Sequence, residues 1–461
     1  MTTKRHQLLE RLSMTALLVV IAALPFSYHP FVSFGSVSGM HLDGSLLYIF
    51  TVLAVVISLP LLWKRRNELL QIRTLQLLTG FAALCSISVI WSDNPVRGGV
   101  TAAFLLLLIG LVCVMAVNLP LLIQHRQLAY RLLLASTSVS IAWALWQIYG
   151  DAFGVDGSFT LLPAAYQSAV FGVARPTGFS LEPQFFGSFL LIPFFWLIWR
   201  YLTGAHKYSL LSHLGIITIG TVILLTLSRG AIYAALVGLA LLVLLHHSSL
   251  KRWLYVTGSL IGAVVIGGCV IVSAATVNQR DSMSGYASLS SAVNHLSLGR
   301  ITLPNSTPNV AQSESKSKES SGYVTDSTDS RLGMSAQALS LWSANPQQLL
   351  FGIGSGSFGA TLHAQDSRYS KGSIVNNYYL ELLVETGLVG FGLFLTFVGT
   401  LLYRLFRTHL VLPLVIFVSL LVQACFFSGN ANIIHLWVIV GISLGLLLLP
   451  AKKVARLVQL N

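Results

Sequence analysis

The stretch VTAAFLLLLIGLVCVMAVNLPLLI, from Val100 to Ile123, holds 24 residues without one charged side chain. A helix needs about 20 apolar residues to cross the hydrocarbon core of a bilayer, so this stretch predicts a membrane-spanning helix. The rest of the chain has the same character. Of its 461 residues, 54% are hydrophobic and 9% are charged, whereas a soluble domain carries about 25% charged residues. The sequence therefore predicts an integral membrane protein.

Twelve apolar runs of this kind lie along the chain, and we expect an all-α polytopic membrane protein of about 12 transmembrane helices. The runs cover residues 12–33, 45–63, 74–91, 100–123, 132–149, 184–202, 210–227, 230–247, 253–274, 376–403, 410–427 and 436–450. The first run lacks a small-residue cleavage site, so it is interpreted as an uncleaved helix rather than a signal peptide. Residues 1–274 then hold helices 1–9, residues 275–375 form a loop, and residues 376–461 hold helices 10–12.

The basic residues predict which side of the membrane each loop faces. If the N-terminus is cytoplasmic, 18 of the 28 Lys and Arg residues fall on the cytoplasmic side, as the positive-inside rule requires. These are Lys4, Arg5, Arg11, Lys64, Arg65, Arg66, Arg73, Arg126, Arg131, Arg200, Lys207, Lys251, Arg252, Arg404, Arg407, Lys452, Lys453 and Arg456. Both termini are predicted to be cytoplasmic and the long loop periplasmic. This placement accounts for the net charge of +13 without a nucleic-acid partner.

Three arginines remain in short outer loops, against the rule: Arg97, Arg175 and Arg229. Arg229 lies in LTLSRGAIYAAL, where Ser228 is a suitable N-cap and Gly230 permits a sharp turn. A helix N-terminus favours a bound anion. The alternative is that Arg229 anchors the helix at the interface or pairs with a carboxylate.

Arg175 lies in ARPTGFSLEP, ahead of Glu182 and Pro183. Proline suits the first turn of a helix, and a glutamate beside it is well placed against the helix dipole. Glu182 is therefore open to three interpretations: a structural role at the helix start, an ion pair with Arg175 or Arg229, or a base.

A third polar segment, NNYYLELLVETGLVG, begins at Asn376. Glu381 and Glu385 are four residues apart and share a helix face. Both fall within the first three turns of a predicted membrane helix, where an ionisable side chain costs free energy and is usually functional or paired. Asn376 and Asn377 would cap this helix or contact a polar substrate. The alternative for the glutamates is capping and pairing with an arginine.

Within the long loop, AQSESKSKESSGYVTDSTDS is Ser-rich, has no apolar period and is predicted to be disordered. The segment RLGMSAQALSLWSANP predicts an amphipathic helix ended by Asn345–Pro346, with Leu332, Ala336, Leu339 and Trp342 on its apolar face. GIGSGSFG lacks a βαβ context, so it is interpreted as a flexible loop near the site rather than a nucleotide-binding loop. The cysteines, Cys85, Cys113, Cys269 and Cys425, lie in apolar runs without metal-ligand spacing.

Four motifs of the chain, taken in their order along the sequence, resemble those of the O-antigen ligase/polymerase family of bacterial inner-membrane glycosyltransferases. They are RPTGFSLEP, the SRG break between helices, RLGMSAQALSLWSANPQQLLFGIGSGSF and NNYYLELLVETGLVG. The resemblance covers about residues 175–400 and the twelve-helix layout. It implies a transfer on the periplasmic face without metal or cofactor, from a glycan on undecaprenyl pyrophosphate to a sugar hydroxyl.

The resemblance also implies roles for single residues. Guanidinium groups bind phosphate bidentately and keep their proton, so Arg175 and Arg229 are assigned to the pyrophosphate, with Arg97 as a third candidate. Glu182 or Glu385 is the hypothetical base, and His363 is the next candidate for it. The expected substrate-binding residues are Arg97, Arg331, Asn376, Asn377, Tyr379 and Glu381.

One departure from the family bears on the reaction. Ligases of the family carry a histidine at the place that Asn376 holds here, and asparagine takes no proton at neutral pH. We therefore favour a polymerase that extends another lipid-linked glycan over a ligase that passes the glycan to lipid A–core. A chain-length regulator and a flippase remain open as partners beside the lipid-linked oligosaccharide and membrane lipids.

Two other classes fit less well. A twelve-helix transporter would show two similar six-helix halves, whereas the long loop divides this chain into nine helices and three. A cell-shape peptidoglycan polymerase shares the architecture but matches the motif set less closely.

Overall fold

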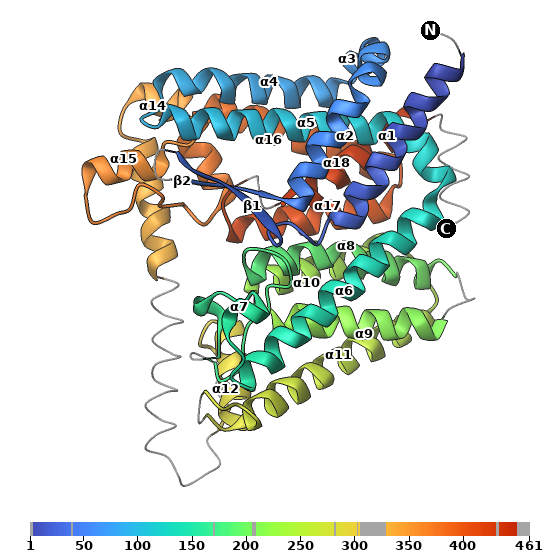
Figure 1. The fold of residues 1–461 in the computed structure, drawn as a ribbon, viewed down its shortest axis with the longest axis vertical. Helices are drawn as coiled ribbons and strands as arrows, with labels where there is room; N and C mark the ends of the chain where they lie inside the picture. The colour runs from blue at the N-terminus through green and yellow to red at the C-terminus, as the bar shows by residue number, and fades with distance from the viewer. Residues whose placement is uncertain are drawn as a thin grey trace. The chain divides into compact units, whose positions relative to one another are not determined.

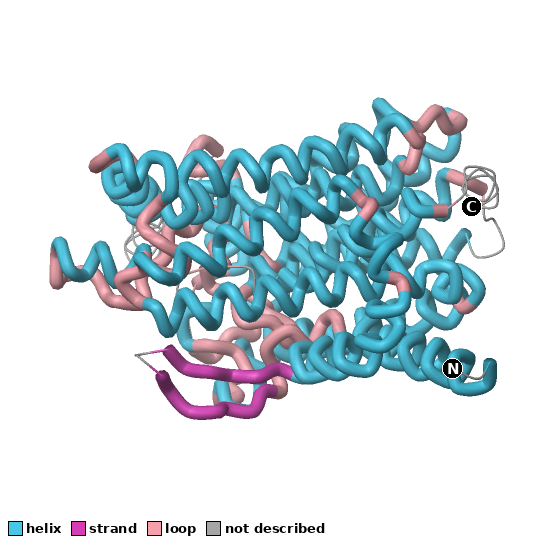
Figure 2. Tube along the Cα trace, turned by 90° about the horizontal axis from the view of Figure 1, so that it is seen from above, coloured by secondary structure: helices cyan, strands magenta, loops and turns pink. Residues whose placement is uncertain are grey.

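The computed structural model describes residues 3–37, 40–168, 171–204, 209–280, 283–301, 303–304, 329–429 and 433–449. Helices dominate these residues, as Figures 1 and 2 show. The chain divides into two compact units. The first unit comprises Met1–Leu133 with Leu332–Leu460, and the second comprises Leu134–Arg331.

Each of the twelve predicted runs overlaps a helix, and the first run does so only in part. These helices are α1 (Thr3–Ala23), α2 (Leu46–Lys64), α4 (Arg73–Ser88), α5 (Pro95–Gln124), α6 (Arg126–Ala152), α8 (Pro183–Leu202), α9 (Ser209–Leu225), α10 (Arg229–Leu245), α11 (Leu250–Thr276), α16 (Tyr378–Arg407), α17 (Val411–Gln423) and α18 (Ile434–Leu448). Among the described residues, seven helices are long and apolar enough to cross a membrane, and shorter apolar helices accompany them. The protein is therefore a polytopic membrane protein, and the number and direction of its crossings stay predictions.

Short helices connect the long ones. They are α3 (Arg66–Leu70), η1 (Val89–Trp91), α7 (Gly157–Thr160), η2 (Ala164–Tyr166), α12 (Gly285–Leu296), α14 (Pro346–Phe351), α15 (Phe358–Gln365) and η4 (Ala424–Phe426). The predicted cytoplasmic residues Lys207, Lys452, Lys453 and Arg456 lie outside the described residues, as does most of the Ser-rich stretch.

The described residues are helical as predicted, apart from one two-stranded hairpin after the first helix. The run 12–33 was expected to be helical throughout, but α1 ends at Ala23 and the strands β1 (Phe31–Val37) and β2 (Met40–Ser45) follow. They pair antiparallel, with Phe31 opposite Ser45, and are drawn in magenta in Figure 2. Pro25 explains the early end of α1, because proline cannot continue a helix and disfavours the helical conformation of the residue before it.

In the first unit, α1 pairs with α2, α5 packs against both, and α18 lies along α5. A buried polar joint links three of these helices. Asn118 of α5 donates to the Ser13 hydroxyl over 2.8 Å, and the Ser13 and Ser58 hydroxyls lie 2.6 Å apart. Such interhelical hydrogen bonds stabilise membrane bundles by about 0.6 kcal/mol each. Helix α4 also belongs to this unit and packs against both α5 and α16.

In the second unit, α8 is the most buried of the long apolar helices, and it packs against α9, α10 and α11. Helices α9 and α11 pack along each other, as Figure 1 shows in green. Helix α8 begins at Pro183, directly after Glu182. Because α8 is buried, the position of Glu182 is fixed within the second unit, which also holds Arg175 and Arg229.

A helix forms in the long loop over residues 329–342, and its buried face includes Trp342 but differs at the other predicted positions. Leu332 is 64% exposed and Leu339 is 43% exposed, whereas Ala338 and Leu341 are buried beside Met334 and Trp342. Asn345 does not end this helix. It caps the next one, α14, by accepting a hydrogen bond from the backbone N–H of Gln348 over 2.9 Å.

Candidate active site

The turn between α9 and α10 has an unusual backbone. Leu227 has φ +48°, a left-handed conformation that is uncommon for a leucine. The Thr226 hydroxyl accepts a hydrogen bond from Ser228 N, and the Ser228 side chain caps α10 by accepting from Ala231 N. Arg229 is the first residue of α10. The S-R-G break thus folds as the sequence predicted, as a capped helix start.

Arg175 reaches the same turn from a distant part of the sequence. Its Nε donates to the Thr226 carbonyl over 3.2 Å, and its Nη2 donates to the Leu227 carbonyl over 3.4 Å. The guanidinium also lies over the ring of Tyr166, 5.6 Å from its centroid. These contacts fix Arg175 two residues before the start of α10, so the structure brings Arg175 to the turn from which Arg229 begins the helix.

Gln147, on α6, holds the segment that carries Arg175. Its Oε1 accepts hydrogen bonds from the backbone N–H groups of Thr177 and Gly178, each over 2.9 Å. Its Nε2 donates to the carbonyls of Thr160 and Gly178. The side chain is fully buried. We did not single out Gln147 from the sequence, although an amide inside an apolar run is a signal, because a buried amide needs partners.

His295, on α12, is a second residue that sequence reasoning missed. It is buried, its Nε2 lies 3.1 Å from the Leu227 carbonyl, and its ring packs against Phe171. Burial, together with the positive charges of Arg175, Arg229 and Arg331, lowers its pKa to about 3. The ring is therefore neutral at physiological pH and donates from Nε2. The charges of three arginines consequently act on His295, which bonds to the Leu227 turn.

Glu182 stands at the N-cap position of α8, where its charge lies near the helix N-terminus, but its side chain makes no capping hydrogen bond. Its Oε2 accepts a hydrogen bond from Gln184 over 2.5 Å. Burial raises the pKa of Glu182, while the Gln184 hydrogen bond, the charges of Arg331 and Arg175 and the Tyr166 hydroxyl oppose that shift. The carboxyl thus lies in the field of two arginines, and the structural, ion-pair and base interpretations all remain.

The remaining predicted residues belong to the first unit. Asn377 caps α16 by accepting from the backbone N–H groups of Tyr379 and Leu380. The Tyr379 hydroxyl donates to the Leu421 carbonyl over 2.7 Å. Asn376 has φ +60°, a conformation that asparagine tolerates better than most residues. Both Asn377 and Tyr379 thus bond to the protein's own backbone.

Residues 352–358, here called the glycine loop, are not flexible, contrary to the prediction. Helix α16 is broken at Gly387, which has φ +62°. Beside this break, Ile353 N donates to the Val384 carbonyl over 2.9 Å and Gly354 N donates to the Glu385 carbonyl over 3.0 Å. Every residue of the glycine loop is buried. The loop is therefore an inserted, ordered part of the first unit.

The Glu385 side chain faces this loop. Its Oε1 lies 3.5 Å from Phe358 N, and the Gly356 N–H also bonds to the carboxylate. On the other side of the loop, the hydroxyls of Ser92 and Ser357 lie 2.6 Å apart. This geometry gives Glu385 a structural part, since its carboxylate binds backbone N–H groups of the glycine loop.

Arg97 lies close to the two glutamates of α16. Its Nη1 donates to the Lys371 carbonyl over 3.3 Å, and its charge acts on the carboxylates of Glu381 and Glu385. His363 Nδ1 lies 2.7 Å from the Tyr369 carbonyl, so it donates to the protein's own backbone.

The predicted residues divide between the two units. The second unit holds Arg175, Glu182, Arg229 and Arg331, and the first unit holds Arg97, Asn376, Asn377, Tyr379, Glu381 and Glu385. Within the described part of the chain, no group of three His, Cys, Asp or Glu side chains could hold a metal ion.

No curated protein sequence matches the chain. Residues 214–395 match the model of a protein family described as O-antigen ligase. The match begins in α9, includes the S-R-G turn, His295 and Arg331, and ends in α16. The members of this family are membrane glycosyltransferases of surface polysaccharide biosynthesis and include both ligases and polymerases. The resemblance inferred from the motifs is thus confirmed for residues 214–395, which form an O-antigen ligase domain and hold three of the four motifs, whereas RPTGFSLEP lies before the matched region.

Proposed function

We propose that the protein is a surface polysaccharide polymerase. It transfers a glycan from undecaprenyl pyrophosphate to a sugar hydroxyl of another lipid-linked glycan, at the periplasmic face of the inner membrane. The convergence of Arg175 and Arg229 on the Leu227 turn, with the charge of Arg331 acting on the histidine that bonds to this turn, carries the proposal. A cluster of arginines beside a helix N-terminus suits a pyrophosphate.

In this proposal the arginines stabilise the leaving group. The acceptor oxygen forms a bond to the anomeric carbon as the bond between that carbon and the pyrophosphate oxygen breaks. Negative charge then builds on the pyrophosphate. Fixed cations aimed at such charge lower the barrier, and one lost donor costs about 3–4 kcal/mol in a well-studied oxyanion hole. The bonds from Arg175 to two backbone carbonyls keep the guanidinium in place before the substrate binds.

Glu182 is the favoured base. It belongs to the same unit as the arginine cluster, and its raised pKa brings it closer to the value that suits proton transfer near neutral pH. It takes the proton of the acceptor hydroxyl while the pyrophosphate departs with the bonding electron pair. Glu385 is less suited to this role, because its carboxylate binds the backbone of the glycine loop.

A ligase is the second candidate, since the matching family model is described as O-antigen ligase. Asn376 favours the polymerase, because an amide offers no proton acceptor where the family's ligases carry a histidine. Deletion in the native host separates the two reactions. Single repeat units on surface glycolipid after deletion support a polymerase, and loss of all attached glycan supports a ligase.

The test of the arginine cluster uses a host that lacks its own polymerase. Arg175→Ala and Arg229→Ala are expected to abolish long glycan chains on gels of surface glycolipid, while Arg300→Ala, an exposed arginine of the same unit, leaves them unchanged. If either cluster variant yields normal chains at a normal protein level, its role at the pyrophosphate is wrong. Glu182→Gln is expected to reduce chain formation while retaining binding of the lipid-linked donor.

A further inference from the structure

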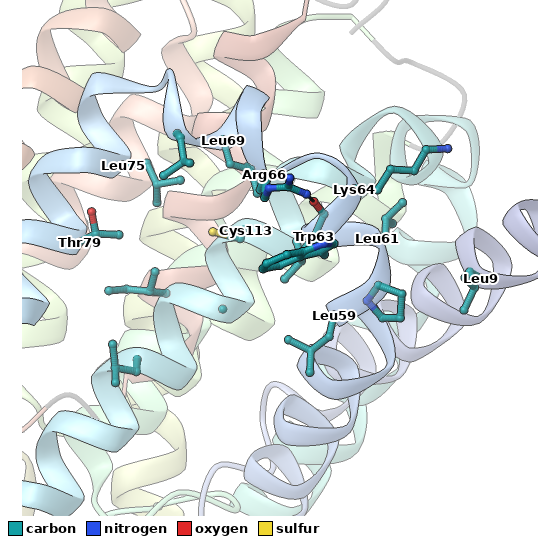
Figure 3. A pocket seen from close by; sticks show the side chains of 16 residues that line it. Leu9, Leu59, Leu61, Trp63, Lys64, Arg66, Leu69, Leu75, Thr79 and Cys113 are labelled. Atoms are coloured by element: carbon teal, nitrogen blue, oxygen red, sulfur yellow. Dashed lines mark hydrogen bonds between the residues drawn. The ribbon is translucent and has the colours of Figure 1, made fainter. Parts of the chain in front are cut away.

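A large apolar groove lies in the first unit, at the end of the bundle remote from the glycine loop. Its volume is about 1060 Å³, and its lining comes from α1, α2, α3, α4 and α5. Figure 3 shows Leu59, Trp63, Leu69 and Leu75 around it. Leu75 and Thr79 belong to the first turns of α4, whereas Ser88, at the other end of α4, bonds to the glycine loop. At 1.5 Å per residue, Leu75 and Ser88 are about 20 Å apart along the helix.

Apart from its rim, the groove is lined almost entirely by apolar side chains. Along α5 it extends from Leu106 to Cys113, which is about 10 Å of helix, or a third of a bilayer core of about 30 Å. Leu59 is 52% exposed and Leu106 is 54% exposed. In a membrane protein, such an open surface is covered by acyl chains, because lipid is the solvent there.

The rim of the groove is cationic and ordered. The Arg66 guanidinium lies over the Trp63 ring, 4.5 Å from its centroid, and its Nη1 donates to the Trp63 carbonyl over 3.0 Å. Trp63 itself is 71% exposed, as expected of a tryptophan at the interface between membrane and water. The acidic side chain of this rim, Glu68, pairs with Arg65 over 2.7 Å. Arg66 therefore presents its charge directly above the apolar lining, with Lys64 also on the rim.

We propose that this groove binds an anionic phospholipid. The acyl chains lie along α2, α4 and α5, and the headgroup phosphate meets the guanidinium of Arg66. Guanidinium groups bind phosphate bidentately, and each basic residue near an anionic membrane surface contributes about 1 kcal/mol. A zwitterionic lipid fills the same groove but lacks the net charge, so the site selects by headgroup. The proposal is independent of the reaction catalysed in the second unit.

The test compares lipids retained by the purified full-length protein. The protein is incubated in detergent with phosphatidylglycerol or phosphatidylcholine, and bound lipid is counted by native mass spectrometry. Wild type is expected to retain phosphatidylglycerol in preference, and Arg66→Gln is expected to lower that preference about five-fold, as the loss of about 1 kcal/mol implies. Arg407→Gln removes an exposed arginine from the end of α16 and is expected to keep the preference.

A second variant tests the groove without changing charge. Thr79→Trp places a large side chain on the lining and is expected to reduce retention of both lipids. The proposal is overturned if Arg66→Gln keeps the wild-type preference, if wild type shows no preference, or if Thr79→Trp retains lipid normally. It is also overturned if undecaprenyl phosphate displaces phosphatidylglycerol at equal concentration, because the groove would then be a site for the polyprenyl chain.

Discussion

The Nε2 of His295 lies 3.1 Å from the carbonyl oxygen of Leu227, at the turn whose next residues begin α10. The same carbonyl accepts a hydrogen bond from Arg175. A neutral histidine and an arginine thus share one acceptor, and His295 holds the turn in the conformation that aligns Arg175 with Arg229. We regard His295 as a positioning residue of the candidate active site.

Replacing His295 is therefore expected to reduce glycan transfer. His295→Leu removes one of two donors to the Leu227 carbonyl, and the loss of one hydrogen bond costs about 0.5–1.5 kcal/mol, so the rate is expected to fall about two- to ten-fold. His295→Gln can donate from its amide and is expected to restore much of the rate. The measurement is the rate of chain formation in isolated membranes. Equal rates for His295→Leu and His295→Gln would contradict the positioning role, and His125→Leu serves as an exposed control.

His295 also predicts a pH dependence of stability. Its folded pKa of about 3 lies below the ordinary value of 6.5, so the unfolded state takes up a proton first as the pH falls. Stability is then lost from about pH 6.5 downwards until about pH 3. At pH 5 the loss relative to pH 7 is about 2 kcal/mol. Thermal unfolding of the purified protein at both pH values checks this, and His295→Gln is expected to show a smaller loss. The prediction would be contradicted if the thermal stability of His295→Gln fell between pH 7 and pH 5 as much as that of wild type.

Gln147 is predicted to matter for stability more than an exposed glutamine of the same helix. Gln147→Leu leaves the buried N–H groups of Thr177 and Gly178 without their acceptor, which costs about 1–3 kcal/mol for each group. A lower midpoint of thermal unfolding and weaker glycan transfer are expected together. Gln127→Leu, on the exposed part of α6, should change neither. A normal melting curve for Gln147→Leu would show that the segment keeps its shape without the amide.

Gly387 is predicted to tolerate no side chain. Its φ of +62° costs an L-residue about 1–2 kcal/mol, and a Cβ there would lie 2.4 Å from the backbone of Leu350. Gly387→Ala is expected to lower the thermal stability and the level of the protein in membranes. Gly392→Ala lies on the same helix with nothing within 4 Å of the added carbon, and is expected to be neutral or slightly stabilising. Equal behaviour of the two variants would contradict the prediction.

The helices of this protein could be predicted because the signal is strong and local. A run such as Val100–Ile123 admits few structures in a membrane, since its backbone groups must bond within the segment. The hairpin after α1 was missed because the run 12–33 was judged by hydropathy alone, and Pro25 was not used as a helix end. The apolar face of the helix at residues 329–342 was missed because Leu332 and Ala338 both fit an apolar stripe, and only packing decides between them.

The candidate site was predictable only in part, for a related reason. Arg175 and Arg229 stood out because the positive-inside rule disfavours arginine in short outer loops. No such rule distinguishes His295, which lies in a loop helix, and the amide of Gln147 in an apolar run indicates only that it needs partners, not which ones. Their importance comes from the groups that they meet across the fold, at Leu227 and Gly178. The glycine loop was judged flexible from its composition, whereas its glycines permit close approach to the backbone of α16.

The bonds between the glycine loop and α16 have a consequence for how this sequence can vary in length. Ile353 and Gly354 are matched to Val384 and Glu385 through main-chain groups, so many side chains could change while these bonds persist. The number of residues cannot change as freely. One residue inserted between Gly352 and Ile353 would shift each N–H away from its carbonyl. The main-chain bonds thus fix the length of the glycine loop, and related chains should differ there in amino-acid sequence but not in the number of residues.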